Sequence, residues 1–433
     1  MKKIKLSFSR FLSGFKLDKA SPFFLIYLFL FLYMPPILSF NIVIPLAMVG
    51  IVYLVTKFKN IRKYMNQFRQ TGFWKICLLI VCGFLYLAVT LPLHGFQLRS
   101  AYPAFLISIL NVVCLFFIFV FALLHHYDLT DIINMLLLVS LVQCLLSVLT
   151  VLIPSLRQMF IQLYLSRGYS SVYTWLDWRL FGFSNELLFS MPIVQSFLAL
   201  CALFFTFNRS YWYALFLPFL LFSSMMNARI GIVIFGIGFL VLLFFQIQRG
   251  NREKNSVLLK SIGIFAGFGV IACALMCWLI PQTGEWFLSM FRDVFELSKG
   301  NRTGFFEYMF ERNGMTLPTG KDLLLGTGSF VLGGSEGVSS DCGFINDLWL
   351  GGLFYAAVMW GSMVLQLRLC FRKRKTFNTY LSVMLFITFL IANFKGPFFT
   401  ENEMFVLNGI LSLFILKDIK LGEEKGNVGI GEN

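Results

Sequence analysis

Charged residues are scarce in this sequence. They make up 13% of its 433 residues, whereas a soluble domain carries about 25%. Hydrophobic residues supply 58% and aromatic residues 18%, and both are spread over the whole length. A soluble globular protein is therefore excluded. A single membrane anchor is excluded too, because it would gather the apolar residues in one segment.

Histidine is rare as well, and the nine cysteines follow no disulfide or metal-binding spacing. The chain has only three His and neither a Cys-x-x-Cys nor an Asp-x-Asp pair. Every Cys except Cys342 lies in or beside an apolar run. We therefore expect no disulfide framework, no metal site and no cofactor.

Long apolar runs dominate what is present. A helix crosses the hydrocarbon core in about 20 residues, whereas a β-barrel strand is a short alternating segment that these runs do not match. The sequence therefore predicts an all-α fold: a polytopic integral membrane protein with about 12 transmembrane helices in one membrane domain, residues 1–433. The twelve predicted spans are Ser21–Leu38, Asn41–Thr56, Trp74–Leu93, Ala101–Leu124, Ile132–Ile153, Gly182–Phe205, Tyr211–Met226, Ile230–Ile247, Leu258–Ile280, Phe344–Leu367, Phe377–Phe394 and Glu403–Leu416.

The distribution of positive charge predicts how these spans are oriented. On this division, 25 of the 36 Lys and Arg fall in the termini and the loops on the same side of the membrane as the termini. By the positive-inside rule, both termini are cytoplasmic. The basic N-terminus lacks a small-residue cleavage site, so we expect a signal-anchor helix. The net charge of +15 is divided among short loops, and we expect no nucleic-acid partner.

Two extracytoplasmic loops are long, residues 154–181 and residues 281–343, and the second separates the ninth and tenth spans. In the large loop, apolar residues recur at helical spacing, which predicts short amphipathic helices. A helix lying on the membrane surface and a helix packed on the loop's own small core both fit this pattern. The residues that carry it are Trp286, Met290, Phe291, Val294 and Phe295.

Four arginines lie at or near membrane depth on the predicted outer side. They are Arg167, Arg179, Arg229 and Arg302. An Arg at the bilayer centre costs about 2.5 to 3.5 kcal/mol on insertion scales, so such residues tend to pair or to line a polar cavity. The planar guanidinium also suits bidentate binding of phosphate. For any single one of these arginines, snorkelling to lipid headgroups is an equal alternative.

Four short motifs follow one another along the chain. Each one alone is short and rich in glycine, but together they resemble, in order and spacing, the O-antigen polymerases of the Wzy type. This resemblance covers roughly residues 175–355 and includes the number of helices. The motifs are Arg179-Leu-Phe-Gly-Phe-Ser-Asn-Glu186, Asn227-Ala-Arg-Ile-Gly231, Leu324-Leu-Gly-Thr-Gly-Ser-Phe330, and Ser340-Asp-Cys-Gly-Phe-Ile-Asn346 followed by Gly351-Gly352.

The resemblance implies a membrane glycosyltransferase at the outer face of the bacterial inner (cytoplasmic) membrane. Such enzymes transfer a growing glycan from undecaprenyl pyrophosphate onto a lipid-linked oligosaccharide repeat unit. The product is lipopolysaccharide O-antigen, capsule or exopolysaccharide, and a chain-length regulator protein is the implied partner. Carried onto this sequence, the resemblance and the chemistry together give substrate-binding roles to Arg179, Arg229 and Arg167, and catalytic roles to Arg302 and to Asp341 or Glu186 as general base.

Three other functions compete with this interpretation. The related O-antigen ligases usually carry a His where this sequence has Ser340-Asp341-Cys342, which favours the polymerase. A transporter or a flippase of lipid-linked oligosaccharides is also polytopic, but such proteins often show internal repeats and short loops, unlike this sequence. A scaffold subunit of an envelope complex would not need arginines and carboxylates gathered in its outer loops.

Overall fold

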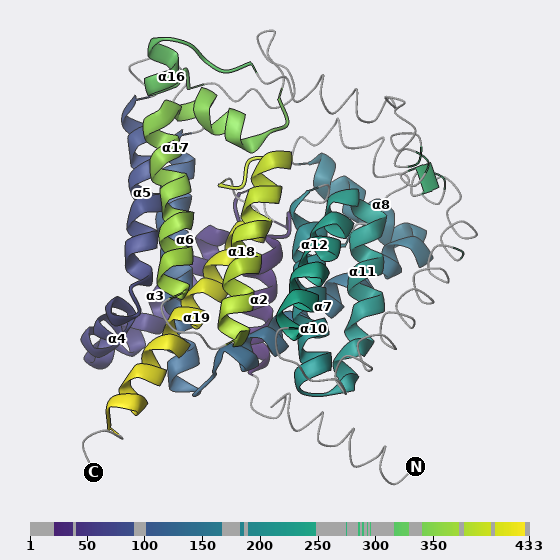
Figure 1. Cartoon of the computed structure of the whole chain (residues 1–433), viewed down its shortest axis with the longest axis horizontal. Helices are drawn as coiled ribbons and strands as arrows, with labels where there is room; N and C mark the ends of the chain where they lie inside the picture. The colour runs from purple at the N-terminus through teal and green to yellow at the C-terminus, as the bar shows by residue number, and fades with distance from the viewer. Residues whose placement is uncertain are drawn as a thin grey trace. The chain divides into compact units, whose positions relative to one another are not determined.

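In the part of the chain that the computed structural model describes, every regular element is a helix (Figure 1). The described residues are 21–37, 40–90, 101–166, 182–185, 189–247, 316–328, 340–371, 376–399 and 403–428, with 274, 285, 288, 289, 292 and 295 as single residues. By its internal contacts the chain divides into two compact units. Unit 1 comprises Met1–Asn41 and Asp131–Glu307, and unit 2 comprises Ile42–Thr130 and Tyr308–Asn433.

Several helices are long and apolar enough to cross a membrane. Within the described residues there are six of these, and a bent pair of helices adds a seventh if it counts as one span. Two shorter apolar helices, Pro22–Tyr33 and Ile230–Phe245, lie at predicted spans. An α-helical membrane protein is thus supported, while the full count of twelve stays a prediction. The ninth predicted span, Leu258–Ile280, lies outside the described residues apart from one helical position.

Unit 1 is a helix bundle around one buried helix, α10, whose apolar stretch is completely enclosed. Polar side chains join the surrounding helices inside this bundle. Tyr33 donates to Ser140 Oγ at 2.7 Å and accepts from Gln195 Nε2 at 2.9 Å. The helices of unit 1 are α2 (Pro22–Tyr33), α7 (Leu129–Leu152), α8 (Pro154–Leu165), α10 (Ser190–Asn208), the 3-10 helix η3 (Tyr211–Leu215), α11 (Phe216–Asn227) and α12 (Arg229–Ile247).

The start of α10 corrects one predicted boundary. The sixth span was expected to begin at Gly182, but the helix begins at Ser190, and residues 182–185 are not helical. Pro192 stands in the first turn of α10, and a helix that began eight residues earlier would place this proline in its interior, where it removes a hydrogen bond and clashes. The sequence therefore held the correct boundary signal.

Unit 2 is a second helical bundle, with a short helix at each end (Figure 1). Helix α4 immediately precedes α5, whereas Tyr86, near the far end of α5, donates to the Leu325 carbonyl of α16 at 3.3 Å. Helices α4 and α16 therefore lie at opposite ends of α5. The helices of unit 2 are α3 (Val43–Thr56), α4 (Phe58–Thr71), α5 (Phe73–Thr90), α6 (Ala101–Leu124), α16 (Lys321–Leu325), α17 (Gly343–Cys370), α18 (Thr376–Lys395) and α19 (Glu403–Val428).

Helix α4 was not predicted, because it lies between the predicted spans Asn41–Thr56 and Trp74–Leu93, in a basic segment that is expected to be a cytoplasmic loop. Its axis is bent by 113° from that of α3, so it leaves the direction of the preceding span. One face buries Phe68 against Phe116 and Phe119 of α6, with ring centroids 5.3 and 5.4 Å apart. The helix ends at Gly72, whose φ of +79° gives the left-handed cap that glycine accepts without strain.

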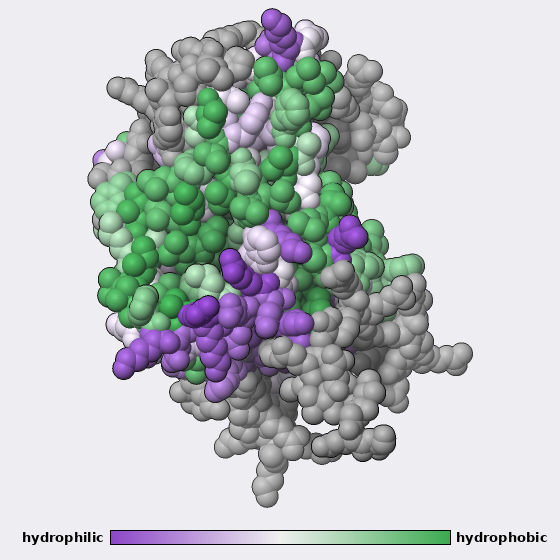
Figure 2. All heavy atoms as spheres, turned by 90° about the vertical axis from the view of Figure 1, so that its left-hand side faces the viewer, coloured by the Kyte–Doolittle hydropathy of each residue, from purple (hydrophilic) through white to green (hydrophobic). Residues whose placement is uncertain are grey.

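On the surface of unit 2, hydrophobic and hydrophilic side chains occupy different regions along the helices. Figure 2 shows hydrophobic side chains in a continuous band over the exposed face, with hydrophilic side chains gathered at the end where α4 lies. The exposed large hydrophobic residues include Val52 and Val55 of α3 and Leu78 and Val89 of α5. A contiguous apolar band of this kind fits contact with lipid.

Candidate functional site

A kink in α17 organises the candidate site. At Gly352 the backbone has φ 65° and ψ −166°, and it divides the helix into a short segment before the kink and a long segment after it. Only glycine adopts this backbone conformation readily, because a Cβ would clash with its own backbone. A Cβ at this position would also overlap the carbonyl oxygen of Leu324. The kink thus depends on the second glycine of the Gly351-Gly352 pair.

The glycine-rich segment after α16 packs directly on this kink. Thr327 N donates to the Trp349 carbonyl at 2.7 Å, and Gly328 N donates to the Leu350 carbonyl at 3.1 Å. The backbones approach so closely that a Cβ on Gly326 would lie 2.6 Å from the Cα of Gly351. Two of the four motifs in the resemblance, 324–330 and 340–352, are therefore in contact. Residues 329–339 lie outside the described part.

Asp341 lies just before the kinked helix and forms an ion pair. Lys395 Nζ, at the C-terminal end of α18, is 3.3 Å from Asp341 Oδ2. The side chains are 24% exposed for Asp341 and 36% for Lys395, so both reach the surface. Asp341 is the single predicted site residue whose side chain the structure describes.

A second carboxylate, Asp347, lies buried close by in the first segment of α17. Its Oδ2 accepts hydrogen bonds from Trp360 Nε1 at 2.8 Å and from Asn393 Nδ2 at 3.1 Å. The Asn393 Oδ1 accepts in turn from the Phe398 backbone N–H at 3.0 Å. Asp347 thereby holds, through Asn393, the end of α18, where Lys395 is the last residue.

Ser340 and Cys342 belong to the segment that immediately precedes α17. Asn346 donates from Nδ2 to the Ser340 carbonyl at 2.8 Å and to the Cys342 carbonyl at 2.9 Å, and the Ser340 hydroxyl accepts from Cys342 N at 3.2 Å. Burial raises the pKa of the Cys342 thiol. This thiol is therefore a poor nucleophile at neutral pH, because the thiolate is the reactive form.

We call these residues the Asp341 cluster. The cluster consists of Ser340, Asp341, Asn346, Asp347, Asn393 and Lys395. It combines one surface carboxylate and one surface ammonium with a buried polar network that holds their backbones. A carboxylate held in this way can accept a proton from a hydroxyl group, and the ammonium can bind an anion.

The other predicted site residues lie outside the described residues. This holds for Arg167, Arg179, Glu186 and Arg302, and the side chain of Arg229, which begins α12, is also outside. All five belong to the sequence range of unit 1, whereas Asp341 belongs to unit 2. Their joint role with Asp341 stays a prediction. In the large loop, the described positions of the predicted amphipathic segment, among them Leu288 and Phe295, are helical.

The motif at 182–185 is held by side chains of unit 1. Phe183 N donates to Gln143 Oε1 at 3.0 Å, and Asn185 N donates to the Tyr33 carbonyl at 2.8 Å. The Tyr164 hydroxyl donates to the Ser184 carbonyl. A non-helical segment buried among helices needs such partners, because its backbone groups have no helical ones.

The motif at 227–231 marks a close helix crossing in the same unit. A Cβ on Gly231 would overlap Ser224 Oγ and would lie 2.7 Å from Ser196 Oγ. These two hydroxyls are themselves hydrogen bonded at 2.7 Å. Helices α10, α11 and α12 thus meet at Gly231, two residues after Arg229, which gives this glycine a packing role.

Three residues of the Asp341 cluster were missed by the sequence analysis: Asp347, Asn393 and Lys395. Asp347 carried a usable signal, because an acid inside an apolar run is costly and tends to be paired. Lys395 follows Asp341 by 54 positions, and no local pattern connects them. Among the described residues, no group of three or more His, Cys, Asp or Glu is arranged to hold a metal ion.

Comparisons with protein-family models, with curated proteins and with solved structures found no match to this chain.

Proposed function

We propose that this chain is a Wzy-type polysaccharide polymerase of the bacterial cytoplasmic membrane. It would transfer a growing glycan from undecaprenyl pyrophosphate onto a lipid-linked repeat unit at the outer face. The observation that carries the proposal is the Asp341–Lys395 ion pair of 3.3 Å, at the end of an apolar helix bundle and beside the contacting glycine-rich motifs. The order of the four motifs supports it from the sequence.

The proposed reaction is a displacement at an anomeric carbon. The bond between this carbon and the pyrophosphate oxygen breaks, and its electron pair leaves with undecaprenyl pyrophosphate. The acceptor hydroxyl oxygen forms the new bond, and its proton passes to the carboxylate of Asp341. Arg179, Arg229 and Arg302 would stabilise the charge on the leaving group, with Arg167 at the edge of the substrate site.

Lys395 gives Asp341 a defined orientation in this scheme. The contact engages Oδ2, and Oδ1 is the oxygen that we assign to the acceptor hydroxyl. Because 24% of the Asp341 side chain is exposed, a sugar can reach it without rearrangement of the helices. Asp347, which is 3% exposed, is assigned the positioning role through Asn393.

The test is a strain that lacks the gene, complemented with the wild type or with Asp341→Asn. A matched control is Asp322→Asn, which removes the same charge from an exposed position in α16. Loss of a general base lowers a rate about 10²- to 10⁴-fold, so Asp341→Asn should leave glycan capped at one repeat unit. The control should restore the full ladder, and immunoblots should show equal amounts of each variant in the membrane.

The deletion strain itself separates the competing functions. Glycan of a single repeat unit on the surface supports the polymerase. Polymerised glycan that stays on its lipid carrier outside would mean a ligase, and repeat units trapped on the cytoplasmic leaflet would mean a flippase. A full ladder with Asp341→Asn would show that Asp341 is not the general base. The function would then be decided by the glycan of the deletion strain.

A further inference from the structure

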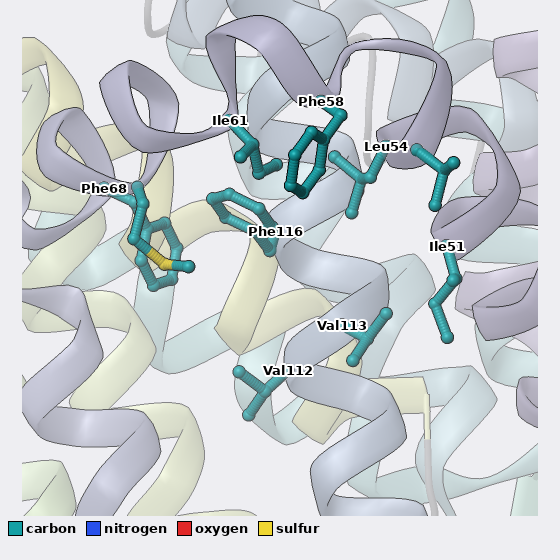
Figure 3. Close-up of a pocket in the computed structure, with 10 residues that line it drawn as sticks. Ile51, Leu54, Phe58, Ile61, Phe68, Val112, Val113 and Phe116 are labelled. Atoms are coloured by element: carbon teal, nitrogen blue, oxygen red, sulfur yellow. The ribbon is translucent and has the colours of Figure 1, made fainter.

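An apolar groove lies between α3, α4 and α6 in unit 2. It encloses about 380 Å³ and is lined only by apolar side chains (Figure 3). Ile51 of α3, Phe58 of α4 and Phe116 of α6 point into it from three sides. The bend of 113° between α3 and α4 opens this space, because α4 turns away from α3 and lies across α6.

The groove is open toward the surroundings. Phe58 is 70% exposed, Val55 is 63% exposed and Met65 is 46% exposed, although all three line it. Large apolar side chains that are exposed together in this way mark a site of contact with a partner or a membrane. The hydrophobic band of unit 2 already indicates contact with lipid, so a lipid acyl chain is the occupant that we infer for the groove.

Basic side chains border the groove along α4. Residues three and four apart share one row on a helix surface, which places Arg62 and Arg69 in the same row as Phe58 and Met65. Both arginines are exposed, and within the described residues neither has a carboxylate partner. Two exposed arginine forks beside an apolar groove match a phosphate group joined to an acyl chain.

The remaining basic residues of this segment are placed differently. Lys57 lies over the Tyr53 ring at 5.9 Å, and Lys75 lies over the Trp74 ring at 5.9 Å. Lys59 and Lys63 are exposed and lie about a quarter turn further around α4, away from the groove. The two arginines therefore form a distinct pair at its rim.

We propose that α3, α4 and α6 form a binding site for one anionic phospholipid. Its phosphate binds Arg62 and Arg69, and one of its acyl chains fills the groove beside Phe58 and Phe116. The site lies at the end of α5 opposite to α16 and the Asp341 cluster, so it is separate from the proposed reaction and does not rest on it. It would hold a single lipid against the bend between α3 and α4.

The experiment measures lipid retained by the purified full chain in detergent, by native mass spectrometry. The probes are phosphatidylglycerol and phosphatidylcholine with identical acyl chains, offered in competition. The wild type should keep one phosphatidylglycerol in preference. Since a Lys or Arg near an anionic headgroup strengthens binding about fivefold, Arg62→Gln with Arg69→Gln should lower this retention about tenfold or more.

Two further variants test the two halves of the site. Lys59→Gln with Lys63→Gln removes the same charge from the same helix and should change retention less than about threefold. Val113→Trp fills the groove from α6 and should lower the retention of both lipids. The arginine and lysine positions are exposed, so these two double variants should keep the thermal unfolding midpoint of the wild type. They therefore test the proposal even if Val113→Trp lowers that midpoint.

Three outcomes would overturn the proposal. Equal losses for the arginine pair and the lysine pair would mean attraction to surface charge in general. Equal retention of the two lipids by the wild type would mean that no headgroup is selected. A dimer that disappears with Val113→Trp would assign the groove to a second copy of the chain.

Discussion

Asp347 Oδ2 accepts a hydrogen bond of 2.8 Å from Trp360 Nε1, although both residues belong to α17 and stand 13 positions apart. In a straight helix, 13 residues span about 20 Å. The contact exists because the kink at Gly352 turns the first segment of α17 across the direction of the second (Figure 1). The ring of Phe344 packs on Trp360 at 5.1 Å and reinforces the same fold. The polar network beside Asp341 is thus built by the kink.

We expect Asp347→Ala to destabilise unit 2. The change leaves the buried donor of Asn393 and the half-buried donor of Trp360 without their acceptor, and a buried donor left in this way costs about 1–3 kcal/mol. Thermal unfolding in detergent measures the effect. Asp322→Ala, at an exposed position of α16, should unfold at the wild-type temperature. Identical unfolding of both variants would show that the Asp347 network contributes nothing to stability.

The kink itself makes a sharper prediction. Gly352→Ala should lower the free energy of unfolding by about 1–3 kcal/mol or more, because the backbone there is left-handed and a Cβ overlaps the Leu324 carbonyl. Gly361→Ala is the control in the same helix, since nothing lies within 4 Å of a Cβ at that position. This control should be neutral or stabilising by up to about 1 kcal/mol. If both alanines behave alike, the kink is not required.

Lys395 allows a test of positioning separate from stability. In the proposed polymerase, we expect Lys395→Met to lower the polymerisation rate about tenfold to a hundredfold through misplacement of Asp341, at unchanged amounts in the membrane. Lys395→Arg keeps the ion pair and should retain most of the activity. Lys321→Met, at an exposed position in α16, should behave as the wild type. A wild-type glycan ladder from Lys395→Met would refute the role of the ion pair.

The helix crossing in unit 1 can be tested at Gly231. Gly231→Ala forces a methyl group into Ser224 Oγ, and overpacking of this kind costs about 1–3 kcal/mol. The matched control is Gly236→Ala, in the same helix, because nothing lies within 4 Å of a Cβ at Gly236. Adding Ser224→Ala to Gly231→Ala should recover part of the loss in thermal stability. Without that recovery, the contact with Ser224 is not the cause.

The sequence predicts the long helices well, because an apolar run of the right length has few alternatives near a membrane. The predicted spans Ala101–Leu124 and Phe377–Phe394 match α6 and α18 to within a residue. Helix α4 was missed because four of its side chains are basic, and the count of positive charges assigned this segment to a loop. Its surface also carries Phe58, Met65 and Phe68. An amphipathic helix shows in the spacing of its apolar residues, which span counting ignores.

The candidate site was only partly predictable for a different reason. Asp341 could be singled out from its motif, but its partner Lys395 ends a different helix. The Gly351-Gly352 pair lies inside an apolar run, and such a pair does not reveal whether the chain bends or two helices merely approach. The bend became evident only with the backbone angles of Gly352 and the contacts of the preceding loop.

The contact between the glycine-rich loop and α17 also sets an order of events during synthesis. Thr327 and Gly328 leave the ribosome before Trp349 and Leu350, whose carbonyls are their acceptors. The 22 residues between Thr327 and Trp349 take roughly 1–4 seconds to translate at about 5–20 residues per second. Until α17 has emerged and bent, the backbone N–H groups of Thr327 and Gly328 lack these two acceptors. The surface around Asp341 is therefore completed only after the later segment, α17, is in place.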